Sequence, residues 1–172
     1  MLLSHKTSIK ICPEYSNIIG HMCYAASKLW NACNYERHHY KELGLKKYPD
    51  WYYQKKAHKG DLWYRQLPSQ TAQETCKQLD KAWKSFYVLK KTGGIKDPNP
   101  PRFKQGNIPV TYMQMGIRHE KGSDQLRIYP PENGKCDLIV IYEIEEPEQL
   151  SQNGHYLSID LGLHNLSCWN IN

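Results

Sequence analysis

The chain has 172 residues, of which 40% are apolar, and it carries a formal net charge of +6, so it can form one domain or two small ones. No stretch approaches the roughly 18 consecutive apolar residues of a membrane span, and the polar start "MLLSHKTSIKICPEY" does not fit a signal peptide. Six scattered cysteines without a CxxC pair predict reduced core thiols in a cytoplasmic protein, and no zinc site within this chain.

The charge is unevenly distributed along the chain. Residues 1–104 hold 19 Lys and Arg against 8 Asp and Glu, whereas residues 105–172 hold 4 against 9. A basic half that is rich in Tyr and Trp is typical of nucleic-acid-binding proteins, although a basic solvated surface would have the same composition.

The N-terminal half is predicted to be a strand followed by helices. "TSIKICP" indicates a short strand that ends at Pro13. Helical apolar spacing runs from about Asn17 to Leu43, and Gly44 supplies a stop.

The following aromatic and basic stretch, residues 46–68, predicts a loop with a short helix. Its aromatic rings lie among cations and could stack on unpaired bases. The candidates are Trp51, Tyr52, Tyr53, Trp63 and Tyr64. We expect at least half of them to be core or loop anchors instead.

The clearest helix is predicted over residues 69–91. Its apolar residues recur at steps of 4, 3, 4 and 3 and are Ala72, Cys76, Leu79, Trp83 and Phe86. Ser69 is the expected N-cap, and "TGG" ends the helix. Lys77, Lys81 and Lys84 share the outer side, which suits either a bound anion or an ordinary solvated helix face.

The chain is predicted to become β-rich after a proline segment. "DPNPPRFKQGNIP" contains four prolines and marks a domain junction. Strands are expected over residues 110–119, 125–130 and 137–146, separated by the turn sequences "EKGSD" and "PENGK". A polar acidic linker follows.

The last predicted strand, "YLSIDLG", carries Asp160 among apolar residues. Three interpretations stay open. Asp160 could bind Mg²⁺ in an RNase H-like nuclease, could begin an actin- or sugar-kinase-type ATPase, or could be a buried carboxylate that caps a turn.

Four segments together resemble the N-terminal portion of the TnpB family of transposon-encoded RNA-guided endonucleases, which are related to type V CRISPR effectors. The segments lie in the same order and at similar spacing as in that family. The first is "SKLWNACNYERHHYKE", with Trp30, Asn31 and Arg37, and the second is "LPSQTAQETCKQLDKAWKSFY", with Gln70, Leu79, Ala82 and Phe86. The third is "PPRFK", and the fourth is "LSIDLGLHNLSCW". The resemblance extends over nearly the whole chain.

The resemblance implies an α+β architecture with an inserted helical lobe. Residues 1–15 and 100–147 would form a wedge-type β-barrel, and residues 16–99 a helical recognition lobe. Residues 148–155 would be a linker, and residues 156–172 would begin an incomplete RuvC-like nuclease domain.

The resemblance also implies binding of a guide RNA and a target DNA. The expected nucleic-acid contacts are Arg37, Lys77, Lys81, Lys84, Lys90, Lys91, Arg102 and Lys104. The alternatives are a nuclease-inactive RNA-guided DNA-binding module, a protein-interaction module and, as the least favoured, the ATPase. A homo-oligomer is a further option.

Catalysis is the point at which the sequence departs from the family pattern. The resemblance gives Asp160 the role of one Mg²⁺ ligand, but a two-metal site needs further carboxylates, and the family's later segments are not among these residues. Glu143, Glu145 and Glu146 are expected to face solvent. This chain alone is therefore predicted to be inactive, with the remaining nuclease half in the same or a second polypeptide.

Overall fold

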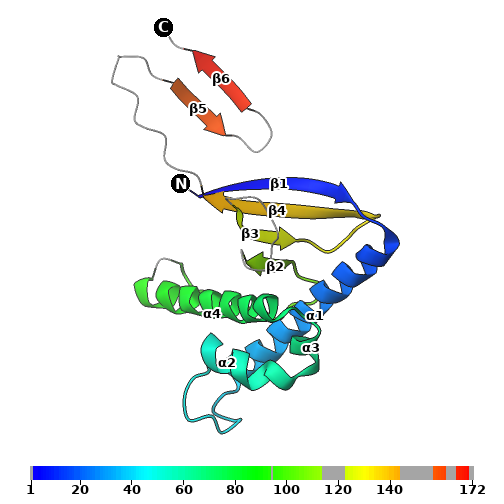
Figure 1. The fold of residues 1–172 in the computed structure, drawn as a ribbon. Coiled ribbons are helices and arrows are strands. Elements are labelled where there is room, and N and C mark those ends of the chain that lie inside the picture. The colour runs from blue at the N-terminus through cyan, green and yellow to red at the C-terminus, as the bar shows by residue number, and fades with distance from the viewer. Residues whose placement is uncertain (1, 94, 114–122, 144–156, 162–165, 171–172) are drawn as a thin grey trace.

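The computed structural model describes residues 2–93, 95–113, 123–143, 157–161 and 166–170. It is an α+β structure in which helices and an antiparallel sheet form separate layers (Figure 1). The expected α+β class is confirmed, whereas the domain boundaries stay predictions. Within the described ranges, no helix combines the length and the apolar composition needed to cross a membrane.

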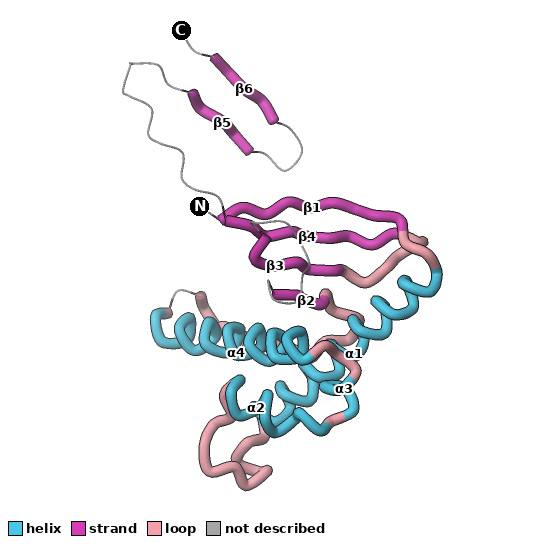
Figure 2. The backbone as a smooth tube through the Cα atoms, in the orientation of Figure 1, coloured by secondary structure: helices cyan, strands magenta, loops and turns pink. Residues whose placement is uncertain are grey.

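Four strands form one antiparallel sheet in the order β1-β4-β3-β2 (Figure 2). They are β1 (Leu2–Lys10), β2 (Val110–Met113), β3 (Ser123–Ile128) and β4 (Lys135–Glu143). The N-terminal strand pairs with the late strand β4 from Leu2 opposite Glu143 to Lys10 opposite Lys135. Strands β1 and β2 are the two edges of the sheet over these residues, so the wedge-type barrel stays a prediction.

The turn between β3 and β4 follows from its sequence. Asn133 and Gly134 both have positive φ angles, 49° and 71°, which a type I′ hairpin turn requires. Glu132 and Lys135 exchange both backbone hydrogen bonds across this turn. The predicted "PENGK" turn is thus confirmed.

The helical layer packs along β2. It contains α1 (Pro13–His38), α2 (Trp51–Ala57), a 3₁₀ turn (His58–Gly60), α3 (Leu62–Arg65) and α4 (Ser69–Thr92). Its core joins α1 and α4 through Ala26, Leu29 and Cys33 on one helix and the predicted seam on the other. In that seam Ala72, Cys76, Leu79 and Trp83 are buried, and Phe86 packs against them.

Three predicted helix ends differ from the structure. Helix α1 begins at Pro13 rather than Asn17, because proline is well suited to the first helical position, and it ends at His38 rather than Leu43. Ser69 is already inside α4, where its hydroxyl accepts a hydrogen bond from Gln73, and Pro68 is the N-cap. Gly93 ends α4 with a φ angle of 67°, as "TGG" predicts.

A separate two-stranded antiparallel sheet contains β5 (Leu157–Leu161) and β6 (Leu166–Asn170). The predicted strand around Asp160 is therefore present, and Asp160 lies opposite Ser167 in its register. The linker 148–155 lies outside the described residues.

Candidate nucleic-acid interface

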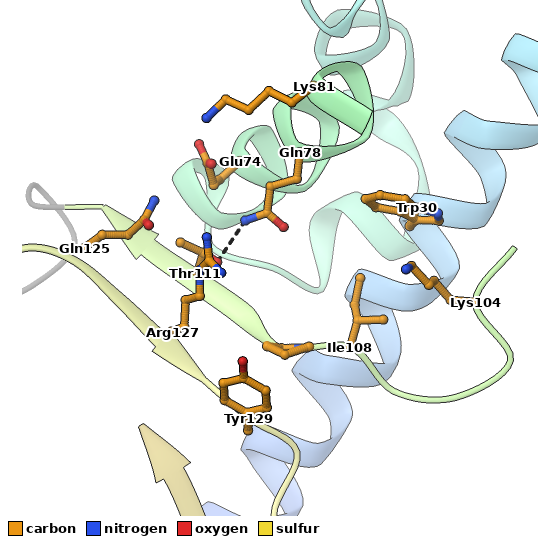
Figure 3. A pocket seen from close by; sticks show the side chains of 11 residues that line it. Trp30, Glu74, Gln78, Lys81, Lys104, Ile108, Thr111, Gln125, Arg127 and Tyr129 are labelled. Atoms are coloured by element: carbon orange, nitrogen blue, oxygen red, sulfur yellow. Dashed lines mark hydrogen bonds between the residues drawn. The ribbon is translucent and has the colours of Figure 1, made fainter. Parts of the chain in front are cut away.

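A groove lies between α4 and the strands β2 and β3 (Figure 3). Its volume is about 370 Å³. We call it the α4 groove, and the side chains that line it include Trp30, Glu74, Gln78, Lys81, Lys104, Ile108, Thr111, Gln125, Arg127 and Tyr129. Three cations against one carboxylate make the groove suitable for an anion, and its amides and aromatic rings suit a nucleotide base.

The walls of the α4 groove are tied together by a polar contact. Gln78 donates a hydrogen bond of 3.0 Å from Nε2 to Oγ1 of Thr111, which joins α4 to β2. Below this contact, Arg127 lies in the groove wall (Figure 3), and its Nε atom is buried without a hydrogen-bond partner in the described part of the chain. Arg127 nevertheless lines the groove, so its guanidinium adds a third cation to Lys81 and Lys104 there.

One rim of the groove is a segment that α1 holds in place. We call residues 101–104 the strap. The Nδ2 of Asn31 donates to the carbonyl of Lys104 at 2.9 Å, and the Lys104 amide donates back to Oδ1 of Asn31 at 2.7 Å. The ammonium of Lys104 lies 4.6 Å from the centroid of the Trp30 ring, in a cation–π contact. Lys104 is thereby fixed at the groove.

The predicted lysine row of α4 has three different environments. Lys81 is exposed at the groove, as predicted for a nucleic-acid contact. The Lys77 ammonium lies 4.9 Å from the centroid of Trp51, and Lys84 pairs with Asp80 at 2.8 Å. The remaining predicted cations, Lys90, Lys91 and Arg102, are exposed at the end of α4 and on the strap. The structure thus brings only Lys81 and Lys104 of the predicted set together in the groove.

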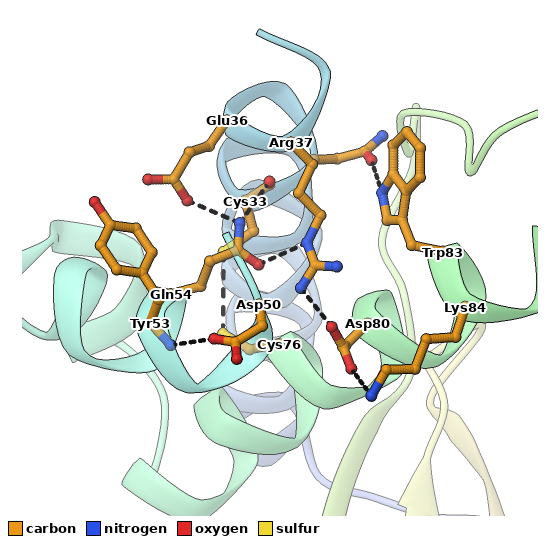
Figure 4. Close-up of polar contacts among 11 residues, drawn as sticks. Cys33, Glu36, Arg37, Asp50, Tyr53, Gln54, Cys76, Asp80, Trp83 and Lys84 are labelled. Atoms are coloured by element: carbon orange, nitrogen blue, oxygen red, sulfur yellow. Dashed lines mark hydrogen bonds and ion pairs between the residues drawn. The ribbon is translucent and has the colours of Figure 1, made fainter. Parts of the chain in front are cut away.

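Arg37 is buried rather than exposed, so its predicted nucleic-acid contact gains no support from the structure and stays a prediction. Its side chain is 1% exposed, and it donates from Nη2 to Asp80 and from Nε to Gln54, each at 2.9 Å (Figure 4). Burial raises the pKa of Asp80, but the hydrogen bonds from Lys84 and Arg37 outweigh this and hold that pKa below its usual range. The helical spacing placed Arg37 on α1 correctly, but the predicted phosphate contact is unsupported because the guanidinium is used to join α1, α2 and α4.

A second polar cluster lies beside this pair. Gln54 donates from Nε2 to the carbonyl of Cys33 and to Glu36, each at 2.8 Å. His58 contacts Glu36 at 3.4 Å and Asp61 at 2.6 Å. The hydrogen bond to Glu36, opposed by burial and assisted by Asp61, raises the pKa of His58 to about 9. His58 is therefore a cation at neutral pH that closes the 3₁₀ turn onto α1.

The predicted stacking residues divide into exposed and packed groups. Tyr52 and Tyr53 are exposed, and the ammoniums of Lys55 and Lys56 lie 4.3 and 4.7 Å from the Tyr52 centroid. Trp51 and Trp63 are half-buried, whereas Tyr64 is part of the core. The burial of Tyr64 leaves its predicted stacking role without support, and stacking by the other four rings stays a prediction.

The catalytic prediction concerns a residue whose side chain lies outside the described set. Asp160 is placed only by its backbone on β5. Among the residues whose side chains the structure describes, no group of three or more His, Cys, Asp or Glu could hold a metal ion. The Mg²⁺ assignment of Asp160 stays a prediction.

Sequence reasoning missed several groove residues, although each had a periodic signal. Glu74 and Gln78 lie at i and i+4 on the helix face that also carries the predicted Lys81. Gln125, Arg127 and Tyr129 alternate with period 2 and so share one face of β3 and its continuation. The sequence does not indicate that these two faces meet, because that depends on how α4 packs beside β2.

Comparison with known proteins leaves the family open. No family model matches the chain, and no curated protein matches it. The function is therefore inferred from the geometry of the groove, the strap and the charge distribution.

Proposed function

We propose that this chain is the RNA- and DNA-binding N-terminal part of a TnpB-like RNA-guided DNA endonuclease. The observation that carries the proposal is the α4 groove, in which the cations Lys81, Lys104 and Arg127 line one space between the helical layer and the sheet. Support also comes from the four sequence segments in the order of that family. Two of these segments, the one around Asn31 and the one around Lys104, are hydrogen-bonded to each other.

The side chains that line the groove have different expected roles, which follow from their chemistry. Lys81, Lys104 and Arg127 would neutralise phosphates, which provides affinity without sequence preference. Gln78 and Gln125 carry amide donors and acceptors that suit base edges. Cleavage is assigned to the completed RuvC-like domain, where Asp160 would supply one of several Mg²⁺ ligands, and not to the groove.

The proposal is tested by the salt dependence of binding. The purified chain is titrated against a labelled RNA hairpin with single-stranded flanks and against a DNA duplex, at two salt concentrations. Because each neutralised phosphate releases condensed counterions, affinity should fall steeply with salt. Lys81→Gln and Lys104→Gln should each weaken binding and reduce the slope of log affinity against log salt by about 1.

The matched control is Lys10→Gln, which removes an equal charge from exposed β1, the sheet edge opposite β2. It should leave the slope unchanged. Absence of binding, or a flat salt response, would overturn the proposal. Equal, salt-dependent binding by all the variants would show that the groove is not the binding surface, whereas absence of binding would favour the protein-interaction alternative, in which charge only provides solubility.

A further inference from the structure

The strap is held against α1 through hydrogen bonds to its backbone. Asn34 is fully buried; it donates to the Pro101 carbonyl at 2.9 Å and accepts from the indole of Trp83 at 2.9 Å. Trp30 donates to the Arg102 carbonyl at 3.2 Å. With the Asn31 pair at Lys104, side chains of α1 bond three of the four strap carbonyls and one strap amide. Such a construction fixes the positions of Arg102, Phe103 and Lys104.

Phe103 is the aromatic side chain of the strap, and it is 47% exposed although it is apolar. Its ring stacks on His38, with centroids 5.6 Å apart and planes inclined by 25°. His38 in turn meets Trp83 edge-on at 5.0 Å, which anchors the stack on the core. His38 therefore covers one face of the Phe103 ring, while nearly half of the side-chain surface stays exposed. An exposed apolar surface does not gain the free energy that burial would provide.

A hollow surrounds this stack. It has a volume of about 370 Å³, and its lining includes His38, Asn99, Arg102, Phe103 and Gln105. Asn99 and Gln105 place amide donors and acceptors at the rim, and Arg102 places a cation beside the ring. A fixed aromatic ring flanked by cations and amides is suited to a nucleic-acid base, whereas an apolar partner would not use these polar groups.

The hollow is connected to the α4 groove. Lys104 and Ile108 line both the groove and a shallow surface pocket that includes Arg102 and Phe103. Cations therefore run from the groove onto the strap, so a phosphodiester backbone lying in the groove can continue past Phe103.

We propose that His38, Phe103 and the strap form a stacking subsite for one unpaired base of the bound RNA, with Arg102 and Lys104 beside its flanking phosphates. This inference rests on the proposed nucleic-acid function and adds to it a place where a single-stranded nucleotide is held.

The test compares Phe103→Leu, which keeps an apolar side chain and removes the π-face, with Phe103→Tyr, which keeps the ring. The probe is a single-stranded RNA of eight nucleotides that carries 2-aminopurine, whose fluorescence is quenched on stacking. Phe103→Leu should weaken binding by about 5- to 100-fold and lose quenching, whereas Phe103→Tyr should bind within about 2-fold of the wild type. The salt slope should not change, because no charge is removed.

Tyr15→Leu is the matched control, since Tyr15 is a 63% exposed aromatic residue near the start of α1, and it should bind like the wild type. His38→Leu is a second variant at the subsite and should also reduce quenching. If the wild type binds RNA in a salt-dependent way and Phe103→Leu shows the same affinity and the same quenching, the subsite is wrong while the proposed function stands. If the wild type binds no RNA at either salt concentration, both fail. Unchanged RNA binding with weaker docking of a protein partner would assign Phe103 to a protein contact and overturn the subsite.

Discussion

Arg37 shows how one side chain can have a role other than the one its charge suggests. Its guanidinium joins three helices through Asp80 and Gln54 in a dry environment. Removing one member of a buried ion pair leaves the other charge without its partner, which is more costly than the pair itself is favourable. The position is therefore expected to matter for folding.

We expect Arg37→Ala to lower the free energy of unfolding by about 3–5 kcal/mol. The control is Lys84→Ala, because the Lys84 side chain is 73% exposed and its pair with the same Asp80 should contribute about 0–1 kcal/mol. Urea unfolding at neutral pH measures both variants. Equal, small effects would show that Asp80 is satisfied without Arg37.

His58 makes the stability of the helical layer depend on pH. Its side chain is 13% exposed, and its pKa in the folded state is about 9, above the ordinary value of 6.5. A raised pKa means that the protonated form stabilises the fold; this stabilisation is complete below pH 6.5 and is lost as the pH rises through 9.

We therefore expect the free energy of unfolding to decrease between pH 6.5 and 9, by an amount on the order of 1–3 kcal/mol. His58→Gln should remove most of this decrease, since glutamine does not titrate. His5→Gln on exposed β1 serves as the control and should keep the pH dependence of the wild type. Urea midpoints across this pH range provide the measurement, and a decrease that persists in His58→Gln would contradict the assignment.

At the scale of elements, the sequence predicted periodic segments well and their contacts poorly. The α4 seam from Ala72 to Phe86 could be predicted because 3.6-residue periodicity is a local property. The Asn133–Gly134 turn could be predicted because only a few residues favour positive φ. The lysine row could not be interpreted fully, since Trp51 and the groove strands reach it from other parts of the chain. The pair between Asp80 and Lys84 is local, at i, i+4 on α4.

The strap is a segment whose lack of regular structure could be predicted from the sequence, whereas its contacts could not. Four prolines in its neighbourhood predicted a junction without regular structure, which the fold shows. The prolines do not reveal that Asn31, Asn34 and Trp30 bond the strap backbone, because those contacts bridge more than 60 positions. Hydrogen bonds from helix side chains replace the missing partners, so the segment is ordered without being a helix or a strand.

At the scale of the whole molecule, binding and cleavage are expected to be separable. The groove and strap depend on α1, α4, β2 and β3, whereas Asp160 lies on β5 in a different sheet. Two metal ions about 4 Å apart need several carboxylates, and Mg²⁺ binds weakly to a single protein ligand. Nucleic-acid binding by these 172 residues should therefore not require Asp160.

We expect the chain with Mg²⁺ to bind RNA without cutting DNA. Supplying the remaining segments of a RuvC-like domain, in the same chain or in trans, should give RNA-guided cleavage. In that completed enzyme, Asp160→Ala should abolish cleavage. The RNA and DNA affinities should stay within about 2-fold of the wild type, because no phosphate-neutralising cation is removed. Gel analysis of a labelled duplex, together with the salt titration, measures both properties. Cleavage by the chain alone, or normal cleavage by the completed Asp160→Ala enzyme, would show that the strand carrying Asp160 has another role.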